Sequence, residues 1–131
     1  MADKLSFELV SPERKLSTGE VDLVVIPGME GEIGIMPDHA PFLTTLRPGI
    51  VTVKDGGEVS EFFVTGGFAE ISASGAAVLA EEAVQRAELN REWFDGKIAT
   101  AQSTLEAAGE ETKQAAAQRL ADFEIAAGLY A

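Results

Sequence analysis

The chain has 131 residues, no cysteine and a formal net charge of −12. The length fits one domain, or one small domain with an appendage, and the lack of cysteine excludes a disulfide framework and thiol chemistry. The acidity argues against nucleic acid or an anionic lipid surface as a partner, because the phosphate field would repel the protein.

The first residues, MADKLSFELVSPE, lack the uninterrupted apolar core of a signal peptide. No apolar run approaches the roughly 18 residues that a membrane span needs. We therefore expect a soluble cytosolic protein that inserts nothing directly into lipid and reaches a membrane only through a partner.

From Leu5 to Ala80 the sequence alternates with a period of two between turns marked by glycine. The dipeptide Asp55-Gly56 separates two β-rich runs and predicts a hairpin with a type I′ turn, in which both central residues have positive φ. Short strands at close turn spacing predict an all-β sandwich or barrel of about eight to ten strands, with its alternating apolar residues in the core.

The segment from Gly28 to Gly49 holds three of the five prolines and the single histidine, His39. Glycine permits backbone angles that other residues avoid, and proline fixes φ, so the segment encodes a specific chain path. Because rigid loops lose little entropy on binding, we interpret this segment as a docking surface. Phe42 and Leu43 either offer apolar contact there or begin a strand that faces the core.

From Ala87 onward the apolar period becomes helical. One predicted helix face carries Phe94, Ile98, Ala101 and Leu105, and a second carries Ala116, Leu120, Phe123, Ala127 and Tyr130. Gly109 suits a left-handed helix end, and Glu110 and Glu111 suit the start of the second helix.

The pattern therefore predicts an α+β chain, with an antiparallel αα-hairpin over residues 87–131 after a β-sandwich over residues 1–86. Alanine-rich seams bury little apolar area per residue. We hypothesise that the hairpin melts without unfolding the sandwich.

Nothing in the sequence predicts catalysis. His39 has neither a second histidine nor a cysteine to complete a usual zinc site, and no serine lies in a G-x-S-x-G elbow. The glycines at 28, 31 and 34 match neither the dinucleotide nor the P-loop spacing. The residues alone thus indicate a protein-binding module without metal or cofactor. A stand-alone β-sandwich protein- or ligand-binding module, and a small hydrolase that uses His39 and Asp38, stay open as alternatives.

Two motifs resemble a known family. Residues 30–41, EGEIGIMPDHAP, resemble the signature E-G-x-x-G-[IL]-x-P-x-H-A-P of the epsilon subunit of bacterial F-type ATP synthases, the counterpart of the mitochondrial delta subunit. Residues 65–70, TGGFAE, are similar to that family's S-G-G-F-x-E stretch. The resemblance covers essentially the whole chain.

The resemblance implies a non-catalytic rotor subunit of the central stalk, which couples gamma to the membrane-embedded, proton-carrying ring during ATP synthesis. The location implied is the cytoplasmic face of the bacterial inner membrane, as a peripheral part of the complex. By this resemblance Ser11, His39, Ala40 and Thr44 lie toward gamma. Glu32, in the turn between Gly31 and Gly34, faces the ring.

The family's helical hairpin is regulatory, and in some members it binds ATP or reaches the alpha and beta subunits of the catalytic head. Here the family's nucleotide pattern [IL]-D-x-x-R-A is altered, since Asn90 replaces the acid, Trp93 the arginine and Phe94 the alanine. We therefore predict no nucleotide binding. From residue 110 onward two bases stand against four acids. We expect weak inhibition of hydrolysis, because like charges oppose docking on an acidic segment.

Overall fold

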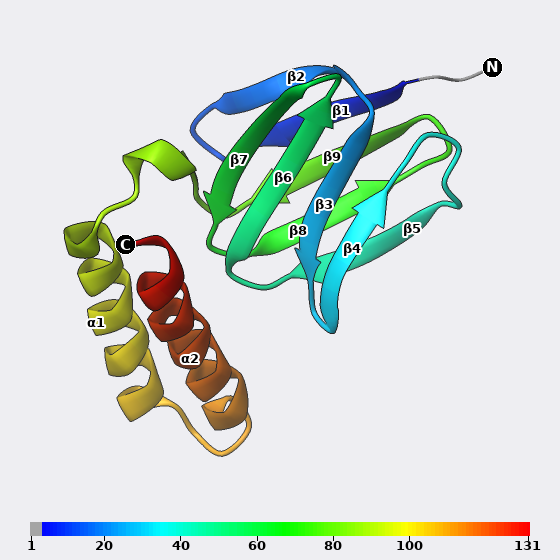
Figure 1. Cartoon of the computed structure of the whole chain (residues 1–131). Coiled ribbons are helices and arrows are strands. Elements are labelled where there is room, and N and C mark those ends of the chain that lie inside the picture. Colours follow the sequence, from blue (N-terminus) through cyan, green and yellow to red (C-terminus); the bar gives the residue numbers. More distant parts are fainter. Residues whose placement is uncertain (1–3) are drawn as a thin grey trace. The chain divides into compact units, whose positions relative to one another are not determined.

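The computed structural model describes residues 4–131. The chain divides into two compact units, one ending at Gln85 and the other running from Arg86 to Ala131. Figure 1 shows strands in the first unit and helices in the second. The strands are β1 (Leu5–Val10), β2 (Lys15–Val21), β3 (Leu23–Gly28), β4 (Gly31–Ile35), β5 (Phe42–Leu46), β6 (Gly49–Asp55), β7 (Glu58–Val64), β8 (Gly67–Ile71), β9 (Gly75–Ala80) and β10 (Ala83–Gln85).

The ten strands form one continuous hydrogen-bonded sheet that folds over on itself (Figure 1). Its order is β10-β7-β6-β3-β5-β8-β9-β1-β2, and β4 pairs with β3 outside this path. Neighbouring strands are antiparallel except β1 and β9, which are parallel. The α+β fold class predicted from the sequence is confirmed, with the strand number at the upper end of the expected range.

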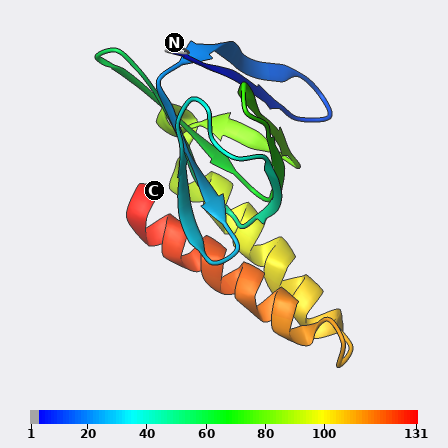
Figure 2. The same cartoon turned by 90° about the vertical axis from the view of Figure 1, so that its right-hand side faces the viewer.

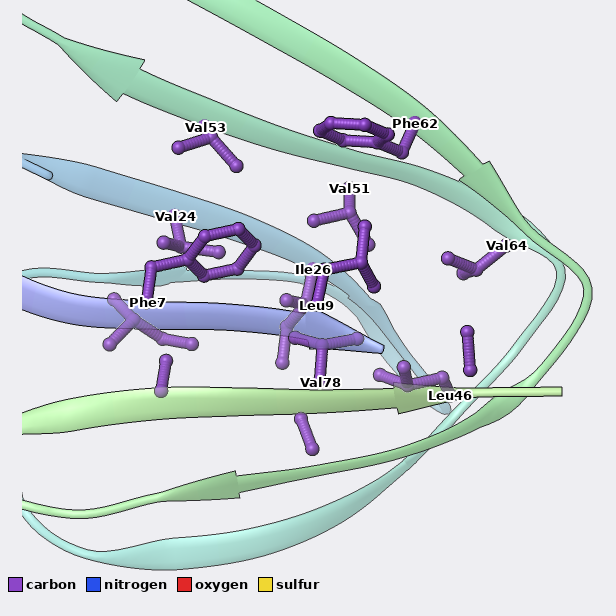
Figure 3. Packing of buried hydrophobic residues seen from close by; sticks show 14 of the residues in the cluster. Phe7, Leu9, Val24, Ile26, Leu46, Val51, Val53, Phe62, Val64 and Val78 are labelled. Carbon is purple, nitrogen blue, oxygen red and sulfur yellow. The ribbon is translucent and has the colours of Figure 1, made fainter. Parts of the chain in front are cut away.

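The core of the first unit lies between the two layers of the folded sheet. Figure 3 shows Val51, Val53 and Phe62 from β6 and β7 pointing toward Phe7, Leu9 and Val78 from β1 and β9. All six are buried. The period-two alternation thus places one face of β1, β3 and β9 inside, as expected for packed sheets.

Strand β8 places one large apolar side chain on the outside. Ala69 and Ile71 are buried, whereas the larger Phe68 is 47% exposed. In β5, Phe42 packs against the core while Leu43 is 67% exposed. The expectation that the alternating apolar residues all belong to the core is therefore wrong for Phe68, which lies on the outer surface.

The β6–β7 hairpin forms where the sequence predicts it, but its turn differs. Asp55 pairs with Glu58, so the central residues are Gly56 and Gly57. Only Gly56 of these two has a positive φ, of 63°. A positive φ at the first central residue alone is the pattern of a type II′ turn, so the predicted type I′ turn is wrong.

The second unit is an antiparallel helical hairpin, in which α1 (Arg91–Ala107) and α2 (Lys113–Tyr130) run side by side (Figure 2). A short 3-10 helix, η1 (Arg86–Glu88), precedes them. Both predicted seams are confirmed: Phe94, Ala101, Ala116, Phe123 and Ala127 are buried, and Ile98, Leu105, Leu120 and Tyr130 are half-buried.

The connection between the helices departs from the sequence prediction. α1 ends at Ala107 and its cap residue Ala108 is extended, with φ −72° and ψ 141°, while Gly109 does not have the positive φ of a left-handed helix end. Instead the Gly109 carbonyl accepts hydrogen bonds from the backbone N–H groups of Thr112 (3.2 Å) and Lys113 (3.0 Å). α2 therefore begins at Lys113, after the predicted acidic start at Glu110 and Glu111.

Candidate functional site

Exposed apolar side chains gather on the outer surface of β1, β9, β8 and β5. The strand register aligns Val10, Leu79, Phe68 and Thr45 in one row across these four strands. Leu79 is 37% exposed and Phe68 47% exposed, and Leu43 lies one row further along β5. We name the surface made by Val10, Leu43, Phe68 and Leu79 the outer apolar face.

Two open hollows adjoin this face, and Phe68 lines both. The first has a volume of about 490 Å³ and lies between Phe68, Leu79, Val10 and the Ser11-Pro12 turn. The second, of about 350 Å³, is lined by Leu43, Thr44, Thr45, Gly67 and Phe68. Exposed apolar patches mark interaction sites, and aromatic side chains are enriched in protein interfaces, so the surface around Phe68 is a candidate protein-binding site.

Gly67 permits the close strand pairing beneath Phe68. Its φ is +130°, and an added Cβ atom would lie 2.1 Å from the carbonyl oxygen of Leu79. No other residue fits this position without a shift of the backbone. The motif of residues 65–70, which the sequence analysis singled out for a family resemblance, thus sets how Phe68 is presented.

Ser11 lies at one border of the outer apolar face, in the turn between β1 and β2. Its backbone N–H donates to the Arg14 carbonyl (2.9 Å), and the Arg14 N–H donates back to the Ser11 carbonyl (3.2 Å). This tight turn holds Ser11 beside the first hollow. Sequence reasoning found Ser11 only through the resemblance, and it missed Phe68 and Leu79 as surface residues.

Thr44 lies between two surfaces. It alternates with the exposed Leu43 and Thr45, so its side chain lies on the other side of β5. Thr44 lines the second hollow and also a hollow of about 460 Å³ beside Met29, Glu30, Gly31, Glu32 and Ile33. The structure therefore brings Thr44 close to Glu32, although the sequence analysis assigned these residues to different partners.

His39 and Ala40 lie in the loop that leads into β5. The His39 Nδ1 atom is 3.0 Å from the Ala40 carbonyl oxygen, and the His39 ring meets the Phe42 ring edge-on at a centroid distance of 5.4 Å. Asp38, with a positive φ of 66°, donates its backbone N–H to the Ala73 carbonyl (3.1 Å). These contacts fix the path of the loop and give no nucleophile to His39.

Two acidic residues, Glu30 and Glu32, lie at the β3–β4 turn or next to it. Gly28 pairs with Gly31, so Met29 and Glu30 form the turn, and Glu32 lies in β4 opposite Pro27. The expectation that Glu32 occupies a turn between Gly31 and Gly34 is therefore wrong, because the chain has already reversed. Glu30 and Glu32 are nevertheless exposed next to the turn, and Met29 is 51% exposed.

Arg47 supports this turn from the neighbouring chain segment. Its backbone N–H donates to the Pro27 carbonyl (2.9 Å), and its guanidinium Nη1 donates to the Met29 carbonyl (3.4 Å). A planar guanidinium that binds backbone oxygen holds the turn in one orientation. We name Met29, Glu30 and Glu32 the acidic tip.

The three positions at the start of α1 that differ from the nucleotide pattern described above each have a local contact. The Asn90 side chain is the N-cap and accepts the Trp93 backbone N–H at 2.8 Å. The Trp93 ring meets the Phe94 ring edge-on at 5.1 Å, and the Lys97 ammonium lies 5.3 Å from the Trp93 centroid. Phe94 is fully buried. Asn90, Trp93 and Phe94 therefore cap the helix and pack within it.

Within residues 4–131 no group of three or more His, Asp or Glu side chains could hold a metal ion. No helix of this described part is long and apolar enough to cross a membrane.

Comparison with known proteins assigns a family. The family model for the β-sandwich domain of the ATP synthase delta/epsilon chain matches residues 4–86. The chain is also 47% identical over 125 residues to the ATP synthase epsilon chain of Maricaulis maris, which covers 95% of this chain and 94% of that relative. The chain belongs to the ATP synthase epsilon family.

Further relatives agree with this assignment. The ATP synthase epsilon chain of Parvibaculum lavamentivorans is 48% identical over 122 residues, with 92% of each chain covered. The fold of this chain, by itself, also matches a chain in the cryo-EM structure of the Euglena gracilis mitochondrial ATP synthase, with a TM-score of 0.74, 24% identity, and 97% of this chain and 82% of that chain covered. A chain in the Tetrahymena thermophila mitochondrial ATP synthase structure matches with a TM-score of 0.70 and 17% identity, covering 95% and 96%.

Proposed function

We propose that this epsilon-family chain is a non-catalytic rotor subunit in the central stalk of a proton-translocating F-type ATP synthase. In this role it couples gamma to the membrane ring during ATP synthesis, as a peripheral component at the cytoplasmic face of the bacterial inner membrane. Membership of the epsilon family supports the proposal. We assign the docking function to residues 1–86 and a regulatory function to residues 87–131.

The outer apolar face is the observation that carries the proposal, and its occupant is gamma. An exposed ring flanked by two hollows gives a partner an apolar anchor point, and Ser11 and Thr44 line those hollows. We assign His39 and Ala40, in the loop before β5, to the gamma contact as well, and the contacts of His39 with Ala40 and Phe42 hold this loop in shape. A preformed surface of this kind loses little entropy on binding.

The acidic tip is the proposed contact with the ring. Glu30 and Glu32 are exposed there, and Arg47 holds the turn from behind. Carboxylates pair with cationic or N–H donor groups, so the ring loops that meet Glu32 must offer such groups. Since Thr44 lies beside Glu32, the two docking surfaces are neighbours on one rigid strand framework.

The hairpin is proposed to inhibit hydrolysis weakly and to bind no nucleotide. Four of the five cations of residues 86–131 have a partner within this unit: Arg86 lies over Tyr130, Lys97 over Trp93 and Arg119 over Phe123, and Arg91 pairs with Asp95 at 3.1 Å. A hairpin in which most cations have internal partners offers little positive charge to the alpha and beta subunits of the catalytic head.

Co-purification with gamma tests the docking proposal. We expect Phe68→Glu to weaken the gamma complex by roughly tenfold or more, since loss of a central aromatic anchor costs more than about 1.4 kcal/mol. The matched control is Val59→Glu, because Val59 is 57% exposed on β7, away from the outer apolar face. Equal binding by both variants would refute the assigned face, and failure of the unaltered chain to bind gamma would leave the stand-alone module.

The ring and hairpin proposals have separate tests. In the assembled synthase, Glu32→Lys should weaken ring attachment, while Glu58→Lys, which changes an exposed acid in the β6–β7 hairpin, should not.

Deletion of residues 88–131 should change ATP hydrolysis little, and a several-fold rise would contradict weak inhibition. Titration of the free chain with ATP should show no binding at micromolar concentration.

A further inference from the structure

A cation–π contact joins the two ends of the helical unit. Arg86 begins η1, and Tyr130 is the last residue of α2. The guanidinium carbon Cζ of Arg86 lies 5.0 Å from the centroid of the Tyr130 ring. This separation is within the roughly 6 Å at which a cation is attracted to an aromatic face.

The contact lies at the open end of the hairpin. The opposite end is closed covalently by the connection from Ala108 to Thr112. At the open end, the last turn of α2 offers small or exposed residues beside Tyr130: Ala127 is buried, Gly128 is exposed and Leu129 is 64% exposed. Tyr130 is therefore the large side chain available to hold this turn.

Charge favours the same arrangement. The last turn of α2 contains no basic residue of its own. A cation near a helix C-terminus is stabilised by the negative end of the helix dipole. Arg86 supplies that cation from a distant part of the sequence, so its guanidinium interacts favourably with both the ring and the helix end.

Two other cation–π pairs in the unit provide a comparison. Lys97 lies over Trp93, and Arg119 lies over Phe123, each pair being four residues apart within one helix. Such pairs persist when two helices move apart, because both partners move together. The Arg86–Tyr130 contact must break when the end of α2 moves away from η1.

We propose that the contact between Arg86 and Tyr130, which we name the clasp, holds the last turn of α2 against η1 at the end of the hairpin opposite the α1–α2 connection. The inference rests on the proposed regulatory function of residues 87–131 and goes beyond it, because it names the contact that controls opening. Loss of the clasp frees the last turn of α2 first, and separation of the helices begins there.

Hydrogen exchange on the full chain, without partners, tests the clasp. We expect Arg86→Gln and Tyr130→Leu to speed exchange of the amides in the last turn of α2 by about two- to fivefold, the effect of losing one exposed cation–π contact. Tyr130→Phe keeps the ring and should exchange as the unaltered chain does. Lys97→Gln, which removes a cation–π contact within α1, should leave the last turn of α2 unchanged.

Combining Arg86→Gln with Tyr130→Leu should give no faster exchange than either change alone, because both remove one contact. The clasp is wrong if the last turn is unaffected by Arg86→Gln, or if Tyr130→Phe has the same effect as Tyr130→Leu. Protection of β1 and β9 serves as the folding control. Because this measurement uses the free chain, a result that refutes the clasp would leave the proposed binding to gamma, which co-purification tests, unchanged.

Discussion

The two units of the chain bury very different side chains. Among the largest fully buried side chains of the described residues, Phe94 and Phe123 belong to the hairpin, and the others, including Phe7, Leu9 and Val78, belong to the sandwich. The other buried side chains of the hairpin are alanines, apart from Asp122. Since burial of apolar area contributes about 25 cal/mol per Å², we expect the sandwich to be the more stable unit and the hairpin the less stable one.

The largest effect is expected from a cavity in the sandwich. Phe7→Ala removes a ring that is 1% exposed between the two layers. Loss of a buried phenylalanine should lower the free energy of unfolding by about 3–5 kcal/mol. Urea denaturation monitored by a strand-sensitive probe measures this loss. A change below about 1 kcal/mol would show that the layers relax into the cavity.

Native-state hydrogen exchange compares the two units directly. Amides in α1 and α2 should exchange at least about tenfold faster than those in β1 and β9, which corresponds to about 1.4 kcal/mol. The reason is the alanine-rich seam, which buries less apolar area per residue. Equal protection in both units would contradict the hypothesis that the hairpin melts without unfolding the sandwich.

Removal of the α1 cap should have a smaller, local effect. Asn90→Ala removes the side chain that accepts the Trp93 N–H and should destabilise α1 by about 1 kcal/mol. Thermal melting followed by helical circular dichroism measures this loss. Gly96→Ala should change the stability of the same helix in the opposite direction. An added Cβ meets no atom within 4 Å, and alanine should stabilise the helix by roughly 1 kcal/mol.

The smallest effect concerns an exposed ion-pair cluster in the sandwich. The Gly56 N–H (2.7 Å) and then the Lys4 ammonium (3.0 Å) hold the pKa of Asp22 below its usual 3.8. Hydrogen bonds with Asp55 and then Asp22 raise the pKa of Lys4 above its usual 10.5. Each shift favours the charged form in the folded state.

The sign of the pH dependence follows. The contribution of Asp22 is present above pH 3.8 and is lost as the pH falls through its lowered pKa. The contribution of Lys4 is present below pH 10.5 and is lost as the pH rises through its raised pKa. Asp22→Asn should therefore flatten the acid limb of the stability curve, measured by urea denaturation from pH 2 to 5. An unchanged acid limb would show that Asp22 contributes nothing there.

Local patterns predicted much of this structure. Strict alternation around Leu5, Phe7 and Leu9 fixes both the strand and its buried face, because the residues between them are polar. The 3.6-residue period around Phe94 and Phe123 fixes both helical seams in the same way. The glycine and proline positions in residues 28–49 indicated a constrained path, and the family resemblance carried by this segment is confirmed by the relatives.

The sequence by itself therefore determined the two units, their periodicity and the strong acidity. Only the tertiary structure decided that Phe68 lies on the outer face of β8, because an apolar side chain there could equally have met a core. It likewise decided the turn at Gly56, the position of Glu32 within β4 and the contact of Arg86 with Tyr130. Each of these depends on strand register or on residues far apart in the sequence, where local propensity carries no information.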